Sequence, residues 1–246
     1  MPAEARIAAL RSEIASLETS ARPGERPCLP FEIEAMDRRL AGGGLAVPAL
    51  HEVAGASPGP GDDAAATLFA ASIAARAGGG IVLWALSRRD LFAPGLALAG
   101  LEPSRILYAE CRRDEEVLAV MEEGLRHGGL AAVVGEAGRA AMAATRRLQL
   151  AAEEGGTMAL MLRRWRRSGD DPLGLPSAAV TRWRIACAPS APLPVPGVGR
   201  ARWTLALARQ RGGEPFQLDV EAPDEKARVA LAPGAADRAA PALRAA

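Results

Sequence analysis

A glycine-rich turn followed by two aspartates is the part of this sequence with the clearest chemical meaning. Gly55, Gly59 and Gly61 lead into Asp62 and Asp63 at the start of an alanine-rich stretch. Between a strand and a helix, such a turn lets backbone N–H groups converge on a phosphate, and the helix N-terminus adds partial positive charge. A working phosphate loop has lysine and then serine or threonine where the aspartates stand. The sequence therefore predicts the frame of a nucleotide site without its cation.

The two aspartates change the electrostatics of this loop. Lys226 is the single lysine in the whole chain, so no nearby lysine replaces the missing one. At an effective dielectric of about 20, a carboxylate ~4 Å from a phosphate charge repels it by roughly 4 kcal/mol. We therefore expect ordinary ATP binding to be lost. Asp62 and Asp63 could instead accept the free N–H groups of the helix, so that the protein fills its own anion site and the loop is structural.

Composition excludes several other kinds of chemistry. The net charge is +1 and 49% of the 246 residues are hydrophobic, which excludes an acidic disordered tail and a histone-like polycation. Three cysteines without a CxxC pair and only two histidines support neither a zinc site nor a disulfide framework, so we expect no metal and no cofactor. No run of about 18 apolar residues is present, which predicts a cytoplasmic protein without a membrane span.

The alternation of strand-like and helix-like segments predicts the elements that position the loop. The run 81–86 has the continuous apolar character of a strand buried on both faces. Further strands are expected at 105–109, 130–134 and 157–162, and helices at 63–77, 114–126 and 138–153. The pattern is typical of an α/β fold with a doubly wound, mostly parallel sheet. Strand-like runs at 180–186, 201–208 and 215–220 predict an antiparallel extension on the C-terminal side.

The two ends of the chain differ in pattern from this domain. Ile7, Leu10, Ile14 and Leu17 are spaced by three, four and three residues, which predicts an N-terminal helix with a narrow apolar stripe. The stripe could pack on its own domain or form a seam for another protein. We divide the chain into a helix and linker at 1–27, a domain at 28–221 and a flexible tail at 222–246, which is mostly Ala, Pro, Gly and charged residues.

Positive charge is concentrated between residues 163 and 211. This window holds ten arginines and two acids, Asp170 and Asp171, a formal charge of +8 in a nearly neutral chain. The residues that we expect to bind DNA or a partner protein are Arg163, Arg164, Trp165, Arg166, Arg167, Arg182 and Arg202. Arginine beside an exposed indole can hold phosphates and stack bases. In the alternative interpretation, the arginines are solubilising charge and Trp165 belongs to the core. An acid-rich segment at 214–225 could shield the basic edge.

The order of these fragments resembles the ImuA family, RecA-related accessory proteins of bacterial damage-induced mutagenesis. The resemblance is carried by the glycine turn and following strand at 40–55, the loop without lysine, the MALMLRRW run at 158–165, two Arg-Trp pairs and the segment 209–213. It covers roughly residues 1 to 221 and implies a RecA-like fold. RecA-like ATPases also carry a catalytic glutamate after the strand that follows the loop helix and a magnesium-binding acid after the Walker-B strand.

Neither of those acids stands at its expected position. The strand that follows the loop helix, at 81–86, leads into Ser87 without a carboxylate. No base is therefore present there to activate water. Glu136 is displaced by one residue from the Walker-B position, and we interpret it as an acid at the N-terminus of the 138–153 helix. With the missing lysine, these losses predict a protein that is not an enzyme.

The resemblance to the ImuA family further implies an adaptor of the mutagenic bypass of DNA lesions. Its expected partners are an ImuB-type inactive homologue of Y-family polymerases, an error-prone replicative-type polymerase and RecA, with single-stranded DNA as a further candidate. Leu10, Ile14, Leu17 and Trp165 are candidate apolar anchors. The expected location is the cytoplasm, with association to the nucleoid on damage. Two alternatives remain open: a SulA-like inhibitor of cell division, and an atypical RecA-like ATP-binding DNA-repair protein.

Overall fold

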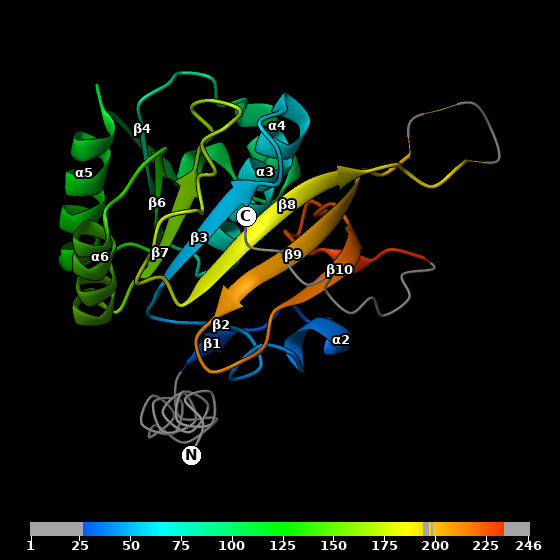
Figure 1. The fold of residues 1–246 in the computed structure, drawn as a ribbon, viewed down its shortest axis with the longest axis horizontal. Coiled ribbons are helices and arrows are strands. Elements are labelled where there is room, and N and C mark those ends of the chain that lie inside the picture. Colours follow the sequence, from blue (N-terminus) through cyan, green and yellow to red (C-terminus); the bar gives the residue numbers. More distant parts are fainter. Residues whose placement is uncertain (1–26, 194–196, 198, 234–246) are drawn as a thin grey trace, which may run out of the picture.

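A nine-stranded sheet forms the centre of the protein in a computed structural model that describes residues 27–193, 197 and 199–233 (Figure 1). The strand order is β11-β10-β9-β8-β3-β7-β6-β4-β5. The strands are β3 (Leu50–Gly55), β4 (Val82–Leu86), β5 (Ile106–Glu110), β6 (Ala132–Ala137), β7 (Met158–Arg163), β8 (Thr181–Ala188), β9 (Arg202–Gln210), β10 (Phe216–Glu221) and β11 (Ala230–Leu231). The strands from β8 to β5 are parallel, and β9, β10 and β11 are antiparallel.

Helices cover both faces of the parallel part of the sheet (Figure 1). The helices α3 (Pro60–Arg76) and α4 (Ala93–Leu98) lie on one face, and α5 (Asp114–His127) and α6 (Met142–Gly155) lie on the other. Because both faces are covered, β3, β4, β6 and β7 are buried along their whole length. A short 3-10 turn, Pro103–Arg105, precedes β5. The doubly wound, mostly parallel α/β sheet predicted for a RecA-like domain is confirmed.

Aromatic packing fixes α3 and the N-terminal segment to the extended side of the sheet. Trp183 of β8 is fully buried, and its ring lies 5.7 Å from Phe69 of α3 and 5.8 Å from Phe216 of β10. Phe31 stacks on Phe69 at 5.8 Å. The N-terminal segment adds a small sheet of β1 (Cys28–Leu29) and β2 (Leu45–Ala46) and the short helix α2 (Glu34–Asp37) near the amino ends of the parallel strands (Figure 1).

Four sequence expectations need correction or fall outside the description. β8 is parallel to β3, so the antiparallel extension begins only at β9. β6 continues to Ala137, and α6 begins at Met142, four residues later than expected. Between them, the backbone N–H groups of Gly138 and Arg139 donate to the carboxylate of Asp114 instead of starting the helix. Residues 222–233 belong to the fold, since β11 pairs with β10 and Val229 is buried. The stripe of Ile7, Leu10, Ile14 and Leu17 and the tail from 234 lie outside the described residues.

Candidate functional site at the carboxyl edge of the sheet

The carboxyl ends of the parallel strands gather the predicted loop and part of the basic cluster at one edge. β3 ends at Gly55 before the loop, β6 ends at Ala137, and β7 ends at Arg163 before Arg164 and Trp165. Gly55 allows a close approach here, because a Cβ on it would lie 3.0 Å from the backbone of Asp62, closer than most such contacts. The start of α3 is therefore packed directly onto the end of β3.

Asp62 connects the loop to β8. Its carboxylate accepts hydrogen bonds from Ser57 Oγ at 2.7 Å and from the backbone N–H of Cys187 at 2.8 Å. The expectation that the aspartates accept the N–H groups of α3 is wrong: no side chain caps the helix, and the N–H of Asp63 donates to Gly59 O at 3.2 Å. The carboxylate of Asp62 is held instead by Ser57 of the loop and by the backbone of β8.

Asp63 is paired with Arg164, which follows the end of β7. Arg164 Nη1 lies 3.1 Å from Asp63 Oδ2 and donates to Thr67 Oγ1 at 2.9 Å, while Arg164 Nη2 lies 2.8 Å from Glu136 Oε2. Burial alone would lower the pKa of Arg164, but Glu136 and Asp63 outweigh it and the pKa is raised. The guanidinium therefore stays charged between two carboxylates.

The loop also offers few free amides. Pro58 and Pro60 have no N–H group. The N–H of Ala56 donates to Ile185 O of β8 at 2.8 Å, and the N–H of Gly59 donates to Ser57 Oγ at 3.3 Å. A phosphate cradle depends on converging amides that point into the loop. In this loop, the two prolines and the hydrogen bonds made by Ala56 and Gly59 leave fewer amides free to bind a phosphate.

Glu136 is a buried member of β6. The interpretation of Glu136 as a helix N-terminal acid is wrong, because its side chain is buried and Oε1 accepts a hydrogen bond from Trp84 Nε1 at 2.8 Å. Its other oxygen binds Arg164. The end of β4 carries no carboxylate, as the sequence indicates, and Ser87 follows its last residue. The signal in the sequence that could have indicated a buried Glu136 is its position as the single charged residue in the apolar run 130–137.

Two of the predicted surface arginines are instead buried around Glu52 of β3. Arg163 and Arg182 are 2% and 9% exposed, and Glu52 is fully buried. Arg182 Nε donates to Glu52 Oε2 at 2.7 Å, Arg163 Nη1 lies 3.4 Å from Glu52 Oε1, and Ser177 Oγ donates to the same oxygen at 2.9 Å. Burial lowers the pKa of Arg163, and Glu52 opposes that effect. The expectation that Arg163, Arg164 and Arg182 form an exposed surface is therefore corrected.

The other residues of the predicted cluster reach the surface to different degrees. Trp165 is half-buried, and its Nε1–H donates to Gly55 O at 2.9 Å. Arg166 is exposed and pairs with Asp114 at 2.6 Å, and Arg167 is exposed. Arg202 lies in β9 opposite Ala188 and is not brought into this cluster. Arg166 and Arg167 are thus the exposed members of the cluster, and the guanidinium of Arg166 is already paired with Asp114.

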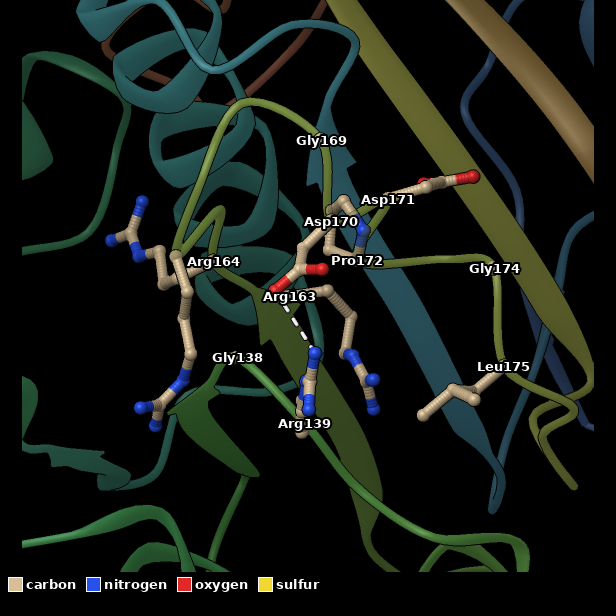
Figure 2. A pocket seen from close by; sticks show the side chains of 11 residues that line it. Gly138, Arg139, Arg163, Arg164, Gly169, Asp170, Asp171, Pro172, Gly174 and Leu175 are labelled. Atoms are coloured by element: carbon tan, nitrogen blue, oxygen red, sulfur yellow. Dashed lines mark hydrogen bonds and ion pairs between the residues drawn. The ribbon is translucent and has the colours of Figure 1, made fainter.

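A cleft of about 740 Å³ extends along the strand ends beside these residues. It is lined by Ser87, Arg88, Arg112, Arg113, Asp114, Glu136, Gly138, Arg139, Arg164, Trp165, Arg166, Arg167 and Asp170. A pocket of about 320 Å³ adjoins it and is shown in Figure 2. Sequence reasoning missed Arg88, Arg112, Arg113 and Arg139, because they follow three different strands and only the parallel sheet brings them together.

The described residues carry neither a metal cluster nor a helix that could span a membrane. In residues 27–193, 197 and 199–233, no group of three or more His, Cys, Asp or Glu side chains is placed to hold a metal ion. Within the same ranges, no helix has the length and apolar character needed to cross a bilayer.

The fold and the site define a doubly wound α/β domain that has the strand, loop and helix of a phosphate site but aspartates in place of its lysine and hydroxyl. No protein-family model matches the chain. Protein ImuA from two strains of Caulobacter vibrioides is 39% identical over 198 residues, which cover 77% of this chain and 81% of the relative. SulA from Pseudomonas aeruginosa, a crystal structure, matches with a TM-score of 0.39 at 25% identity, over 47% of this chain and 98% of its own. The chain belongs to the ImuA family.

Proposed function

We propose that this protein is a non-catalytic adaptor in damage-induced translesion DNA synthesis. Membership of the ImuA family supports a role in DNA damage-induced mutagenesis. The observation that carries the non-catalytic part is the placement of Arg164 between Asp63 and Glu136, at 3.1 and 2.8 Å. The chain's own ion pairs thus occupy Asp63, at the position of the magnesium-binding hydroxyl, and Glu136, one residue from the Walker-B position.

The chemistry of ATP hydrolysis needs groups that this site does not offer. A triphosphate is held by a lysine, by backbone amides and by a magnesium ion. Here the lysine position carries Asp62, whose carboxylate binds Ser57 and the backbone of Cys187. The end of β4, where a catalytic carboxylate would activate water, continues into Ser87 and Arg88. These features support a domain whose activity is binding rather than catalysis.

The proposed partners are those that the resemblance to the ImuA family implies. They are an ImuB-type inactive polymerase homologue, an error-prone replicative-type polymerase and RecA. The proposed place of action is the cytoplasm, at the nucleoid after DNA damage. An adaptor needs separate surfaces for its partners, and the described fold offers exposed apolar side chains such as Phe92 and Leu98 that do not line the basic cleft.

The adaptor role is tested by affinity purification of the tagged full-length chain from damaged and undamaged cells. We expect the ImuB-type homologue, the error-prone polymerase and RecA to be recovered after damage. A parallel assay measures ATP turnover by the purified chain with and without single-stranded DNA, and we expect none. Recovery of none of the three partners, or steady ATP turnover that Asp63→Ala abolishes, would overturn the proposal.

A further inference from the structure

The buried cluster around Glu52 contains more positive than negative charge. Arg163 and Arg182 share this one carboxylate, and Arg163 Nε and Arg182 Nη2 are buried without a hydrogen-bond partner among the described residues. Buried donors of this kind are rare in folded proteins, because an unmade hydrogen bond leaves the cost of desolvation uncompensated. A guanidinium with spare donors favours a nearby anion.

Arg163 lines the pocket of about 320 Å³ at the ends of β6 and β7 (Figure 2). Arg139 and Arg166 line the same pocket. Two acids, Asp170 and Asp171, also line the pocket; Asp170 pairs with Arg139 at 2.9 Å, and Asp171 pairs with Arg184 at 2.6 Å. The pocket therefore combines a buried, partly unpaired arginine with two exposed arginines, Arg139 and Arg166, whose guanidinium groups a phosphate would share with Asp170 and Asp114.

The pocket continues into the larger cleft along the strand ends. The two share Gly138, Arg139, Arg164, Arg166 and Asp170 as lining residues. Seven arginines and three acids line the cleft. Within the described chain, the exposed guanidinium groups of Arg112 and Arg167 take part in no hydrogen bond or ion pair, so both are available to a ligand. The basic surface is thus longer than one phosphate group.

We propose that this cleft binds the sugar–phosphate backbone of single-stranded DNA, with one phosphate in the pocket against Arg139 and Arg163. The inference deepens the proposed function, because it assigns a DNA surface to the adaptor. Half-buried Trp165 is the single large apolar side chain among the cleft-lining residues, and it offers a face on which a base can stack. An acidic protein partner would instead need several apolar anchors. The cleft therefore fits a polyanion better than a protein interface.

The cleft is tested by fluorescence anisotropy with a labelled oligothymidylate and the full chain. We expect Arg112→Ala/Arg167→Ala to weaken binding roughly tenfold and to make the slope of log K against log salt shallower by about 1.4, since each single-strand phosphate contact contributes about 0.7. The matched control is Arg38→Ala/Arg146→Ala, which removes two exposed arginines that line neither cavity. Equal affinity and salt slope for wild type and the cleft variant would overturn the proposal.

The pocket has a test that leaves every arginine in place. Leu175 lines it and is 46% exposed, so Leu175→Glu adds a carboxylate there and Leu175→Gln is its neutral match. We expect weaker DNA binding for Leu175→Glu only. Binding of poly-glutamate as tight as that of the oligothymidylate, in competition, would contradict the DNA assignment and indicate an acidic protein ligand. Affinity purification of Leu175→Glu and Leu175→Gln from damaged cells shows whether the partner proteins are still recovered. This separates failure of the DNA surface from failure of the adaptor role.

Discussion

Arg164 and Glu136 form a buried ion pair, with 2.8 Å between Nη2 and Oε2, across the carboxyl ends of β7 and β6. The side chains are 12% and 4% exposed. Arg164 also reaches Asp63 at the start of α3, so one guanidinium joins three neighbouring elements of the sheet and its helix layer. The pair holds the phosphate-loop end of α3 to the middle of the sheet without a bound ligand.

Removing the charge of Glu136 should destabilise the fold. Glu136→Gln leaves the Arg164 guanidinium buried with Asp63 as its remaining carboxylate, and losing a hydrogen bond between charged groups costs roughly 1.5–3 kcal/mol. Urea denaturation measures the free energy of unfolding. The matched control is Glu34→Gln, whose carboxylate pairs with Arg38 while 79% exposed, and its expected loss is below about 1 kcal/mol. Similar losses in both variants would contradict the structural importance of the pair.

His51 makes stability depend on pH. Burial lowers its pKa from 6.5 to about 4, although the hydrogen bond to Ala46 O opposes the shift. A carbonyl only accepts, so Nε2 carries the proton and donates to Ala46 O, and Nδ1 accepts from Thr181 Oγ1 at 2.8 Å. Because the folded pKa lies below the unfolded value, the stabilisation is fully present above about pH 6.5 and is lost as the pH falls toward 4.

The expected size of this effect is a loss of about 2 kcal/mol in the free energy of unfolding between pH 7 and pH 5. Urea denaturation at several pH values in this range measures it. His51→Gln should flatten the pH dependence, whatever its effect on stability at pH 7, while His127, which is exposed, remains in both proteins. An unchanged pH slope in the variant would show that His51 is not the group responsible.

Cys187 reports on the anchoring of the loop by Asp62. Burial and the neighbouring Asp62 carboxylate raise the pKa of this thiol, which lowers its thiolate fraction at neutral pH. Asp62→Asn should therefore speed alkylation of Cys187 by iodoacetamide at pH 8 several-fold, as followed by peptide mass spectrometry. Cys111 is the internal control, since burial and Glu116 raise its pKa and neither changes in the variant. Equal acceleration at both thiols would indicate general loosening instead.

The alternation of apolar runs and helical segments was enough to predict the α/β sheet and most of its elements. The direction of β8 was missed because its sequence pattern is the same for a parallel and an antiparallel neighbour, and only its pairing with β3 decides. Residues 222–233 were assigned to a tail because composition does not record that β11 pairs with β10.

Site residues were predictable where they follow one another along the chain. The loop from Gly55 to Asp63 and the segment from Arg164 to Arg167 do meet at the same edge. The sequence could not show that Arg163 is buried, because alternate residues at the end of a strand point to opposite faces and Glu52 lies far away in the sequence. Arg112 and Arg139 were missed for the complementary reason: each is an isolated charge until the sheet assembles the cleft.

The proposed absence of nucleotide binding is tested most directly by isothermal titration calorimetry of the full chain with ATP and magnesium. Asp62 stands where the lysine would be, and the carboxylate of Asp63 is ion-paired with Arg164. We therefore predict no saturable binding up to millimolar ATP. Saturable binding at micromolar ATP that Asp63→Ala or Arg164→Ala alters would contradict a loop closed by its own side chains.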